Sequence, residues 1–402
     1  MAPITCTLFS IGSPYTGNWI RFTIAMNRVR RRLYSESLWF WRSAQSRSYG
    51  LHDTQEMDYY VAAMQHAEGS LGMSSLEHIQ ALLLVLLFSL QHDIGISNKW
   101  DLAQVAMRIC IEKDYHRKSP LSARPMESQM RRRVFWSCYI NDRHSSSVLG
   151  RPVGLQDEDI DVELPIDADD DLIESANIDN QVLRGMSEVS AQLRQIRLRQ
   201  ITSRIGKTLY RKPTSHTNSV LQASVELILK ALSDWRVSFP LLVNPRNVYE
   251  TAHWRDLNFY RERLKCFRPF ILLGKESDAP LYRESLHACQ EASSKVASLY
   301  MDLRTSDKLV LNWTCVHDML SAGFTVLFCA LLSRDMVPPR DRSINSSWDK
   351  EYGDFEENVA CILDTLSHIA ERGPTVKKKR QCIQSTGEPC FRLSAAWCHL
   401  LE

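Results

Sequence analysis

The residues best suited to chemistry lie in one stretch of the sequence, from 131 to 165. The stretch begins with three arginines and the aromatic pair Phe135-Trp136, and it ends in a run of carboxylates. Arginines beside aromatic rings are typical of nucleic-acid surfaces, where guanidinium groups contact phosphates and rings stack on bases. Clustered carboxylates suit a divalent cation or acid–base catalysis. The place of these side chains in the fold decides between the two kinds of site.

Metal binding is the weaker of these interpretations. Carboxylates alternate at Asp157, Asp159, Asp161 and Glu163, as hard ligands do in a cation-binding loop. A calcium loop between two helices also needs a central glycine and a closing glutamate in register, and this stretch has neither. The twelve histidines are spread singly and no Cys-x-x-Cys occurs. We therefore expect no metal ion and no other cofactor in this chain.

The sequence also lacks the common local motifs of several enzyme classes. The sequence has no G-x-G-x-x-G, no G-x-S-x-G and no H-E-x-x-H, which are motifs of dinucleotide binding, serine hydrolysis and zinc proteolysis. The nearest approach to a phosphate loop, in 267–277, has Pro269 in place of the first glycine. We predict a protein that is not an enzyme and assign no catalytic residue, with a helical enzyme as the less favoured alternative.

The composition is that of an ordinary globular protein. Of the 402 residues, 44% are hydrophobic and 24% charged, and the formal net charge of +2 gives no strong field toward DNA or a membrane. The eleven cysteines are scattered and odd in number, which favours reduced thiols in the cytosol or nucleus. The N-terminus lacks the pattern of a secretory signal. The longest apolar run, 81–90, is about half as long as a bilayer crossing and predicts a core helix instead.

Hydrophobic spacing predicts an all-α fold that positions the stretch. We expect a buried helix at about 75–91, and a second helix that packs on it. The apolar stripe of this second helix comprises Leu102, Val105, Ala106, Ile109 and Cys110. A third helix is expected at about 126–149, because Gly150 can take the left-handed conformation that ends helices and Pro152 cannot continue one.

An acidic connector follows the third helix. Between Pro152 and Asn180 there are eleven acidic residues and no lysine or arginine, which predicts a solvated, irregular segment over 153–183. From 184 to 212 the sign reverses, with eight basic residues against one acid. We expect an amphipathic helix here, with a basic outer face and an apolar face made of Leu193, Ile196, Ile201, Ile205 and Leu209.

Four more periodic segments, within 220–235, 257–267, 285–303 and 313–333, predict helices, with Pro240, Pro269 and Pro280 in the gaps between them. The domain organisation expected is a basic, poorly patterned segment 1–54, a helical domain 55–372 with halves 55–152 and 184–372, and a basic tail 373–402. In the tail, a short cluster fits a nuclear-import signal, namely Lys377, Lys378, Lys379 and Arg380.

Taken as a unit, the stretch 131–165 with the residues just before it resembles the fungal-specific transcription factor domain, the middle homology region of the fungal zinc-cluster transcription regulators. The ordered match consists of Glu127, Arg131, Arg132, Arg133, Phe135, Trp136, Asp142, Arg143, Gly150, Arg151, Pro152, Asp159, Asp161 and Pro165. The segments SLEHIQALLLVLLFSL, YRERLKCFRPF, ACQEAS and SAGFTVLFCALL look like further helices of the family. The resemblance covers 55–372.

The resemblance implies an all-α regulatory domain of a nuclear transcription regulator for a metabolic or biosynthetic gene set. Its partners would be the transcription machinery or another regulator, with a small-molecule effector as a further expectation and no membrane. The family reads DNA through an upstream module in which six cysteines hold two zinc ions. Only Cys6 lies in the first 100 residues, so zinc is expected only with such a module, and this chain alone should bind DNA weakly.

Two explanations of that difference stay open. The chain is either a piece of a longer regulator or a regulator without its own DNA reader. A DNA-independent interaction or inhibitory module derived from the family is the alternative function. Within the motif we expect Arg143 and Arg151 to be structural, paired with carboxylates such as Glu127, Asp142 or Asp159, because arginine stays charged and must be held by acceptors when it lies among apolar rings.

Overall fold

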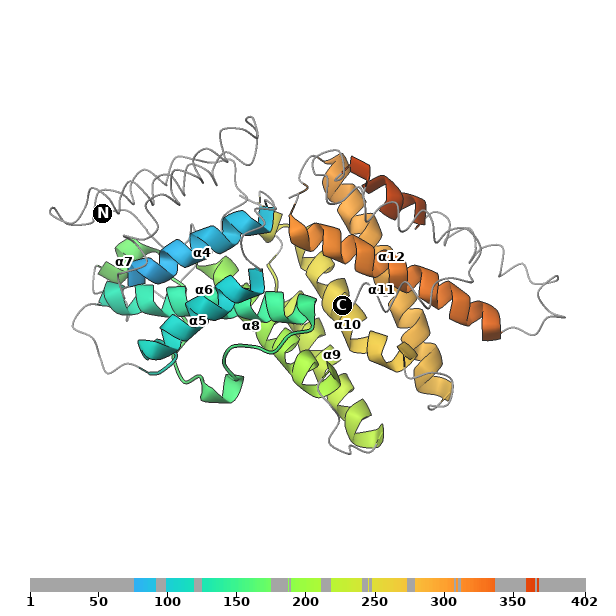
Figure 1. The fold of residues 1–402 in the computed structure, drawn as a ribbon, viewed down its shortest axis with the longest axis horizontal. Helices are drawn as coiled ribbons and strands as arrows, with labels where there is room; N and C mark the ends of the chain where they lie inside the picture. The colour runs from blue at the N-terminus through green and yellow to red at the C-terminus, as the bar shows by residue number, and fades with distance from the viewer. Residues whose placement is uncertain are drawn as a thin grey trace. The chain divides into compact units, whose positions relative to one another are not determined.

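The computed structural model describes residues 76–91, 99–118, 125–174, 187, 189–210, 218–240, 245, 248–272, 279–306, 309, 312–336, 359–365 and 367–368. Within these ranges the regular structure is helical and no strand occurs (Figure 1), which confirms the predicted all-α class. The chain forms two compact units, Met1–Thr251 and Ala252–Glu402. This division falls inside the expected second half. The expected boundaries at 54 and 372, and the tail with its basic cluster, lie outside the described residues.

The first unit is built around one long helix. Helix α6 (Pro125–Leu149) packs against α4 (Leu76–Gln91), α5 (Lys99–Glu112), the short α7 (Asp170–Glu174) and α8 (Ser190–Ile205). The helices predicted at about 75–91 and 126–149 are thus confirmed to within a residue or two, and the predicted second helix is α5. The apolar run of α4 supplies several of the most deeply buried side chains of the unit, among them Leu83, Leu86 and Phe88.

Helix α5 is turned relative to the prediction. Its buried residues are Ala103, Ala106, Met107 and Cys110, whereas Val105 is 46% exposed. Spacings of three and four residues place this buried set on one face of the helix, and Val105 projects from the other. Small side chains at 103 and 106 suit a helix that packs on both α4 and α6. The prediction that Val105 faces inward is therefore wrong. Hydrophobic spacing alone does not show that α5 packs on its neighbours through the small residues Ala103 and Ala106.

The predicted helix after the connector is α8, which ends in a π-turn at Gly206–Tyr210 and is followed by α9 (Asn218–Val237). Its expected apolar face is buried, except that Leu209 is half-buried. Leu198 and Arg199 are buried as well, because α6 and α9 both pack against this helix. The basic outer face is therefore narrower than predicted, with Arg197, Arg204 and Lys207 exposed.

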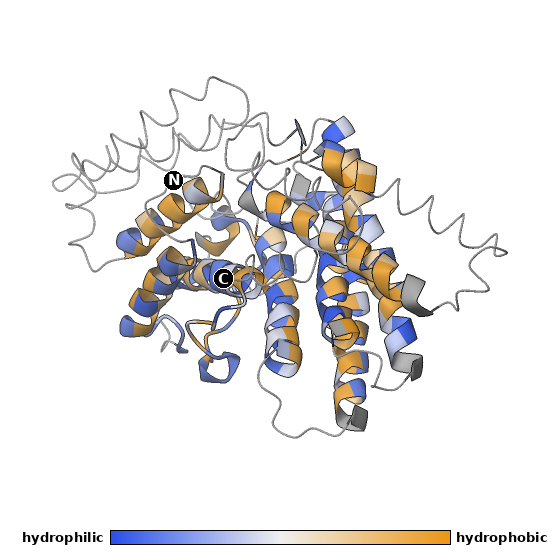
Figure 2. Cartoon of the chain, turned by 45° about the vertical axis from the view of Figure 1, so that its right-hand side comes forward, coloured by the Kyte–Doolittle hydropathy of each residue, from blue (hydrophilic) through white to orange (hydrophobic). Residues whose placement is uncertain are grey.

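The second unit contains α10 (Ala252–Leu272), α11 (Ala279–Thr305) and α12 (Trp313–Met336), followed by helical residues in 359–368. Helix α11 packs against both of the others. Hydrophobic residues, orange in Figure 2, recur along these helices between hydrophilic ones. Residues Thr314–Leu332 of α12 have the length and hydropathy of a membrane span, but half of that window is buried within the protein. A core helix has the same character.

Two prolines that we expected between helices lie within them. Helix α10 continues through Pro269 to Leu272, and the two residues after the proline, Phe270 and Ile271, are buried. Their packing offsets the backbone hydrogen bond that proline removes. Pro280 lies in the first turn of α11, where its missing N–H would have no helical partner in any case. Helix α10 therefore ends five residues beyond the predicted segment 257–267, and α11 begins six residues before the predicted segment 285–303.

Two glycines of the first unit make a matched pair for a test of backbone conformation. Gly150 has φ of 63°, and a Cβ added there would meet nothing within 4 Å. Gly206 also has open space around it, but its φ of −58° and ψ of −45° are helical. We predict that Gly150→Ala lowers the free energy of unfolding by about 1 to 2 kcal/mol, whereas Gly206→Ala raises it by about 0.5 to 1 kcal/mol.

Urea denaturation of the two variants beside the wild-type chain measures both changes. Because neither methyl group meets a neighbouring atom, steric overlap cannot produce a difference between them. Equal effects of the two substitutions would contradict the assignment of Gly150 as the residue whose left-handed backbone ends α6.

Candidate functional site

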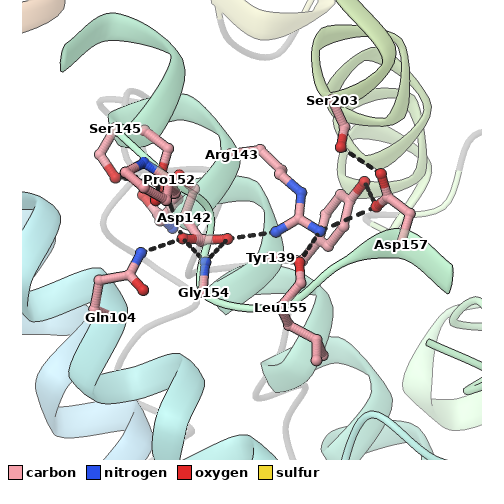
Figure 3. A network of polar contacts seen from close by, with 12 residues as sticks. Gln104, Tyr139, Asp142, Arg143, Ser145, Pro152, Gly154, Leu155, Asp157 and Ser203 are labelled. Atoms are coloured by element: carbon pink, nitrogen blue, oxygen red, sulfur yellow. Dashed lines mark hydrogen bonds and ion pairs between the residues drawn. The ribbon is translucent and has the colours of Figure 1, made fainter. Parts of the chain in front are cut away.

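A buried polar network surrounds Asp142 and Arg143, which are consecutive residues in the C-terminal half of α6 (Figure 3). Both side chains have no solvent exposure, and they form an ion pair through Arg143 Nη1 and Asp142 Oδ2. The other terminal nitrogen, Nη2, donates to the Leu155 carbonyl at 2.6 Å and to Asp157 Oδ1 at 3.0 Å. The guanidinium carbon lies 4.2 Å from the centre of the Tyr139 ring. The cation is therefore held by two carboxylates, a carbonyl and an aromatic face.

Asp142 joins three segments of the chain. Its Oδ1 accepts hydrogen bonds from Gln104 Nε2 of α5 at 2.5 Å and from the Gly154 backbone N–H of the connector at 3.1 Å. Ser146 Oγ, one turn further along α6, lies 3.4 Å from the same oxygen. Charge-assisted bonds of this kind are stronger than neutral ones. One carboxylate thus links α5 and α6 to the start of the connector.

The connector approaches α5 closely at Gly154. A Cβ at this position would lie 2.6 Å from Gln104 Oε1 and 3.1 Å from Met107 Cγ. Both distances are below those of ordinary contacts between atoms that are not bonded. A larger residue at this position would displace the end of the Gln104 side chain, which itself bonds to Asp142.

Asp157 connects the network to α8. It accepts a hydrogen bond from Tyr139 Oη at 2.7 Å and another from Ser203 Oγ, a residue of α8. Burial raises the pKa of Tyr139, so the phenol stays a neutral donor. Burial also raises the pKa of Asp142, against the opposite effect of the neighbouring cation. For Arg143, burial lowers the pKa, but Tyr139 and the two carboxylates outweigh it and raise the pKa above its usual value.

The connector is bound along the rest of α6 as well. Arg133, 2% exposed, donates from Nη1 to Asp170 Oδ1 at 2.6 Å, and Arg132 forms an ion pair with Glu163. The Trp136 indole N–H donates to the Glu163 carbonyl at 3.0 Å. Each of these contacts joins an α6 side chain to a residue of the acidic segment.

The connector is irregular over most of its described length, as predicted, but the prediction that it is solvated is wrong for part of it. Pro165, Ala168, Asp170 and Ile173 are buried. The prediction considered only the acidic residues of the connector. It did not consider that arginine and tryptophan side chains of α6 bind this segment. A segment with many carboxylates packs against a protein when the facing helix supplies the partners.

Arg151 does not take part in the buried network. Its side chain is exposed and lies over the Trp100 ring, with the guanidinium carbon 5.0 Å from the ring centre. The Trp100 indole N–H donates to the Pro152 carbonyl at 3.1 Å. The predicted carboxylate partner for Arg151 is thus wrong, because the left-handed turn at Gly150 directs the chain to the surface, where a cation needs no buried partner.

The remaining acidic residues of the motif lie apart from Arg143. Glu127 pairs with Arg131 one turn away at 2.7 Å on the surface of α6. Asp159 is exposed, and Asp161 accepts the Lys118 backbone N–H at 2.8 Å. Of the expected carboxylate partners, only Asp142 is found, and Glu127 and Asp159 were wrong. Asp157 was missed, since one acid in a run of eleven carries no local signal of its position.

The aromatic pair is also interior. Phe135 and Trp136 are 0% and 4% exposed, and the Trp136 ring makes edge contacts with Phe135 and with Tyr139, with ring centres 5.4 and 5.0 Å apart. Neither ring is free to stack on a base. Among the described residues, no three His, Cys, Asp or Glu side chains come together as a metal site would require. The arginines and aromatic residues at the start of the stretch 131–165 therefore bind α6 to the acidic connector.

The second unit has a smaller network of the same kind. Arg261 of α10 pairs through Nε with Asp318 Oδ2 of α12 at 2.9 Å, and Tyr300 of α11 donates to the same oxygen at 2.6 Å. All three side chains are buried. Burial alone would raise the pKa of Asp318, but Arg261 outweighs burial and lowers it. One carboxylate again joins three segments.

The network makes Arg143 the most sensitive position in the motif. We predict that Arg143→Ala lowers the free energy of unfolding by about 3 to 5 kcal/mol, because it leaves Asp142 buried without its cation. Arg108→Ala is the control, since Arg108 is exposed on α5, and it should change stability by less than about 0.5 kcal/mol. Urea titrations of both variants measure the difference, and equal midpoints would contradict a structural role for Arg143.

Several known proteins that are similar to this chain are named as regulators. A transcriptional regulatory protein of Saccharomyces cerevisiae is 25% identical over 64% of this chain and 38% of its own length. Activator of stress genes 1 of this yeast is 30% identical over 53% of this chain and 23% of its own length. Its pyrimidine pathway regulatory protein 1 is 24% identical over 75% of this chain and 33% of its own length. No solved structure matches the chain.

This chain thus spans less than two fifths of the length of each of these relatives. The family model for the fungal specific transcription factor domain matches residues 33–237, half of the chain. The match contains α4 to α9 and the whole Arg143 network, and it ends before the expected limit at 372. The motif, the helices and this match agree, and the chain belongs to the fungal specific transcription factor domain family.

Proposed function

We propose that this chain regulates transcription in a fungus, as the regulatory part of a protein that controls a metabolic or biosynthetic gene set. The observation that carries the proposal is the family match over residues 33–237. The names of its relatives, a pyrimidine pathway regulator and an activator of stress genes, support control of a specific gene set, although each name describes only that protein.

The chain acts in this proposal through other proteins, namely the transcription machinery or a second regulator, and not by reading bases itself. The buried positions of Arg133, Arg143, Phe135 and Trp136 support this view, because residues that hold a fold together are not available to DNA. The exposed members of the motif, such as Arg151 over Trp100, are available for a partner. A small-molecule effector stays a further prediction.

The proposal includes the absence of catalysis. The described carboxylates of the network are engaged by arginine, amide, hydroxyl or backbone donors, and donors of this kind hold a carboxylate in place. A DNA-independent interaction or inhibitory module derived from the family is the second candidate function, and the same experiment separates it from the first.

A reporter assay tests the proposed function. We expect that the full chain, fused to a foreign DNA-binding domain with its own import signal, changes the expression of a reporter gene severalfold relative to that domain alone. Arg108→Ala should keep this effect, and Arg143→Ala should lose it together with the folded chain. An unchanged reporter, with a fusion protein that is folded and present in the nucleus, would contradict transcriptional regulation and favour the interaction module.

The proposed location of the protein is the nucleus, and the candidate import signal is the cluster Lys377, Lys378, Lys379 and Arg380. We predict that a fluorescent fusion of the chain accumulates in the nucleus and that replacement of all four residues by alanine moves it to the cytosol, because import receptors bind clustered positive charge. Replacement of Arg28, Arg30, Arg31 and Arg32, another basic group of the same size, is the control. Equal nuclear accumulation of all three proteins would exclude the cluster as the signal.

A further inference from the structure

Two thiols of the first unit lie in contact across neighbouring helices. Cys110 Sγ of α5 is 3.6 Å from Cys138 Sγ of α6, and both residues have no solvent exposure. They lie on the faces through which α5 and α6 pack, within the same hydrophobic core. Nothing in the motif or in the proposed function uses either thiol.

We propose that Cys110 and Cys138 form a site of oxidative modification, at which a peroxide converts the two thiols into a disulfide that joins α5 to α6. One thiolate attacks the peroxide, the O–O bond breaks, and a sulfenic acid and an alcohol or water are formed. The second sulfur then bonds to the first and water leaves. The two thiols lose two electrons and two protons, and the peroxide accepts both.

The geometry requires a small movement. A disulfide bond is about 2.05 Å long, so the sulfur atoms have to approach each other by about 1.5 Å from their present separation. The reaction therefore requires rotation of the two side chains together with a slight shift of α5 against α6. The bond would connect residues that are 28 positions apart, a span over which a cross-link restricts the unfolded chain considerably.

Burial sets the rate and the persistence of this reaction. Burial and the adjacent Cys110 raise the pKa of Cys138, so the reactive thiolate is scarce at neutral pH and the first step is slow. The same burial excludes bulky reducing agents from the product. The disulfide therefore forms slowly, on prolonged exposure to peroxide, and it is also reduced slowly.

The disulfide would act on the network around Arg143. Cys138 lies one helical turn before Asp142, and Cys110 belongs to the helix that supplies Gln104 as a donor to that carboxylate. A disulfide at this point fixes α5 against α6 about one helical turn from Asp142. Oxidation would thus stiffen the part of the first unit to which the connector is bound.

Mass spectrometry tests the proposal on the full chain. The reduced protein is treated with hydrogen peroxide, remaining thiols are alkylated during unfolding, and trypsin is added. Trypsin separates the two cysteines into peptides 109–113 and 134–143. We expect these two peptides to appear as one disulfide-linked species, while Cys266, Cys289, Cys315 and Cys329, which are also buried, still carry the alkyl group.

The four thiols of the second unit serve as internal controls, since burial raises their pKa as well. Cys110→Ala and Cys138→Ala should each abolish the linked species and leave the remaining thiol alkylated. The proposal is overturned if the wild-type chain yields no linked peptide before the control thiols are oxidised. It is also overturned if the link forms only at peroxide concentrations that unfold the protein.

Discussion

A guanidinium group without solvent exposure is the constraint on which the first unit depends. Arg143 keeps its charge under all physiological conditions, and a buried cation costs several kcal/mol unless acceptors surround it. The acceptors that it requires come from four places, namely Asp142 beside it, Tyr139 one turn earlier, and Leu155 and Asp157 on the connector. Because these acceptors must converge, the connector has to run back along α6 at Leu155 and Asp157.

The surrounding features follow from this convergence. Gly150 turns the chain at the end of α6, and Gly154 donates its backbone N–H to Asp142 where the connector passes close to Gln104. Ser203 then brings α8 to the far side of Asp157. The second unit uses the same solution independently, with Asp318 between Arg261 and Tyr300. In both units, one buried carboxylate connects three segments, and apolar burial supplies most of the stabilisation.

Much of this could be predicted from the sequence, and the limits have physical reasons. Apolar runs and helix periodicity located α4 and α12, and the helix-ending residues Gly150 and Pro152 located the end of α6, because these signals depend only on the chain itself. The motif order indicated that Arg143 is structural, since arginine among aromatic rings needs acceptors. The choice of Asp157 over Asp159 could not be made, because neighbouring carboxylates are chemically equivalent until the connector's path is known. The exposure of Val105 and Arg151 depended likewise on how α5 packs and where the turn at Gly150 leads.

The central claim is that buried charge on α6 holds the acidic connector in place, and amide hydrogen exchange measures this most directly. The amide of Gly154 is bonded to Asp142, and those of Asp161 and Val162 are bonded to the His116 carbonyl. The account predicts that these amides are protected in the wild-type chain and that Arg143→Lys, which keeps the charge without the fork of donors, removes protection at Gly154 while α10 and α11 exchange as before. Exchange of the Gly154 amide at the rate of an unfolded peptide in the wild-type chain would contradict it.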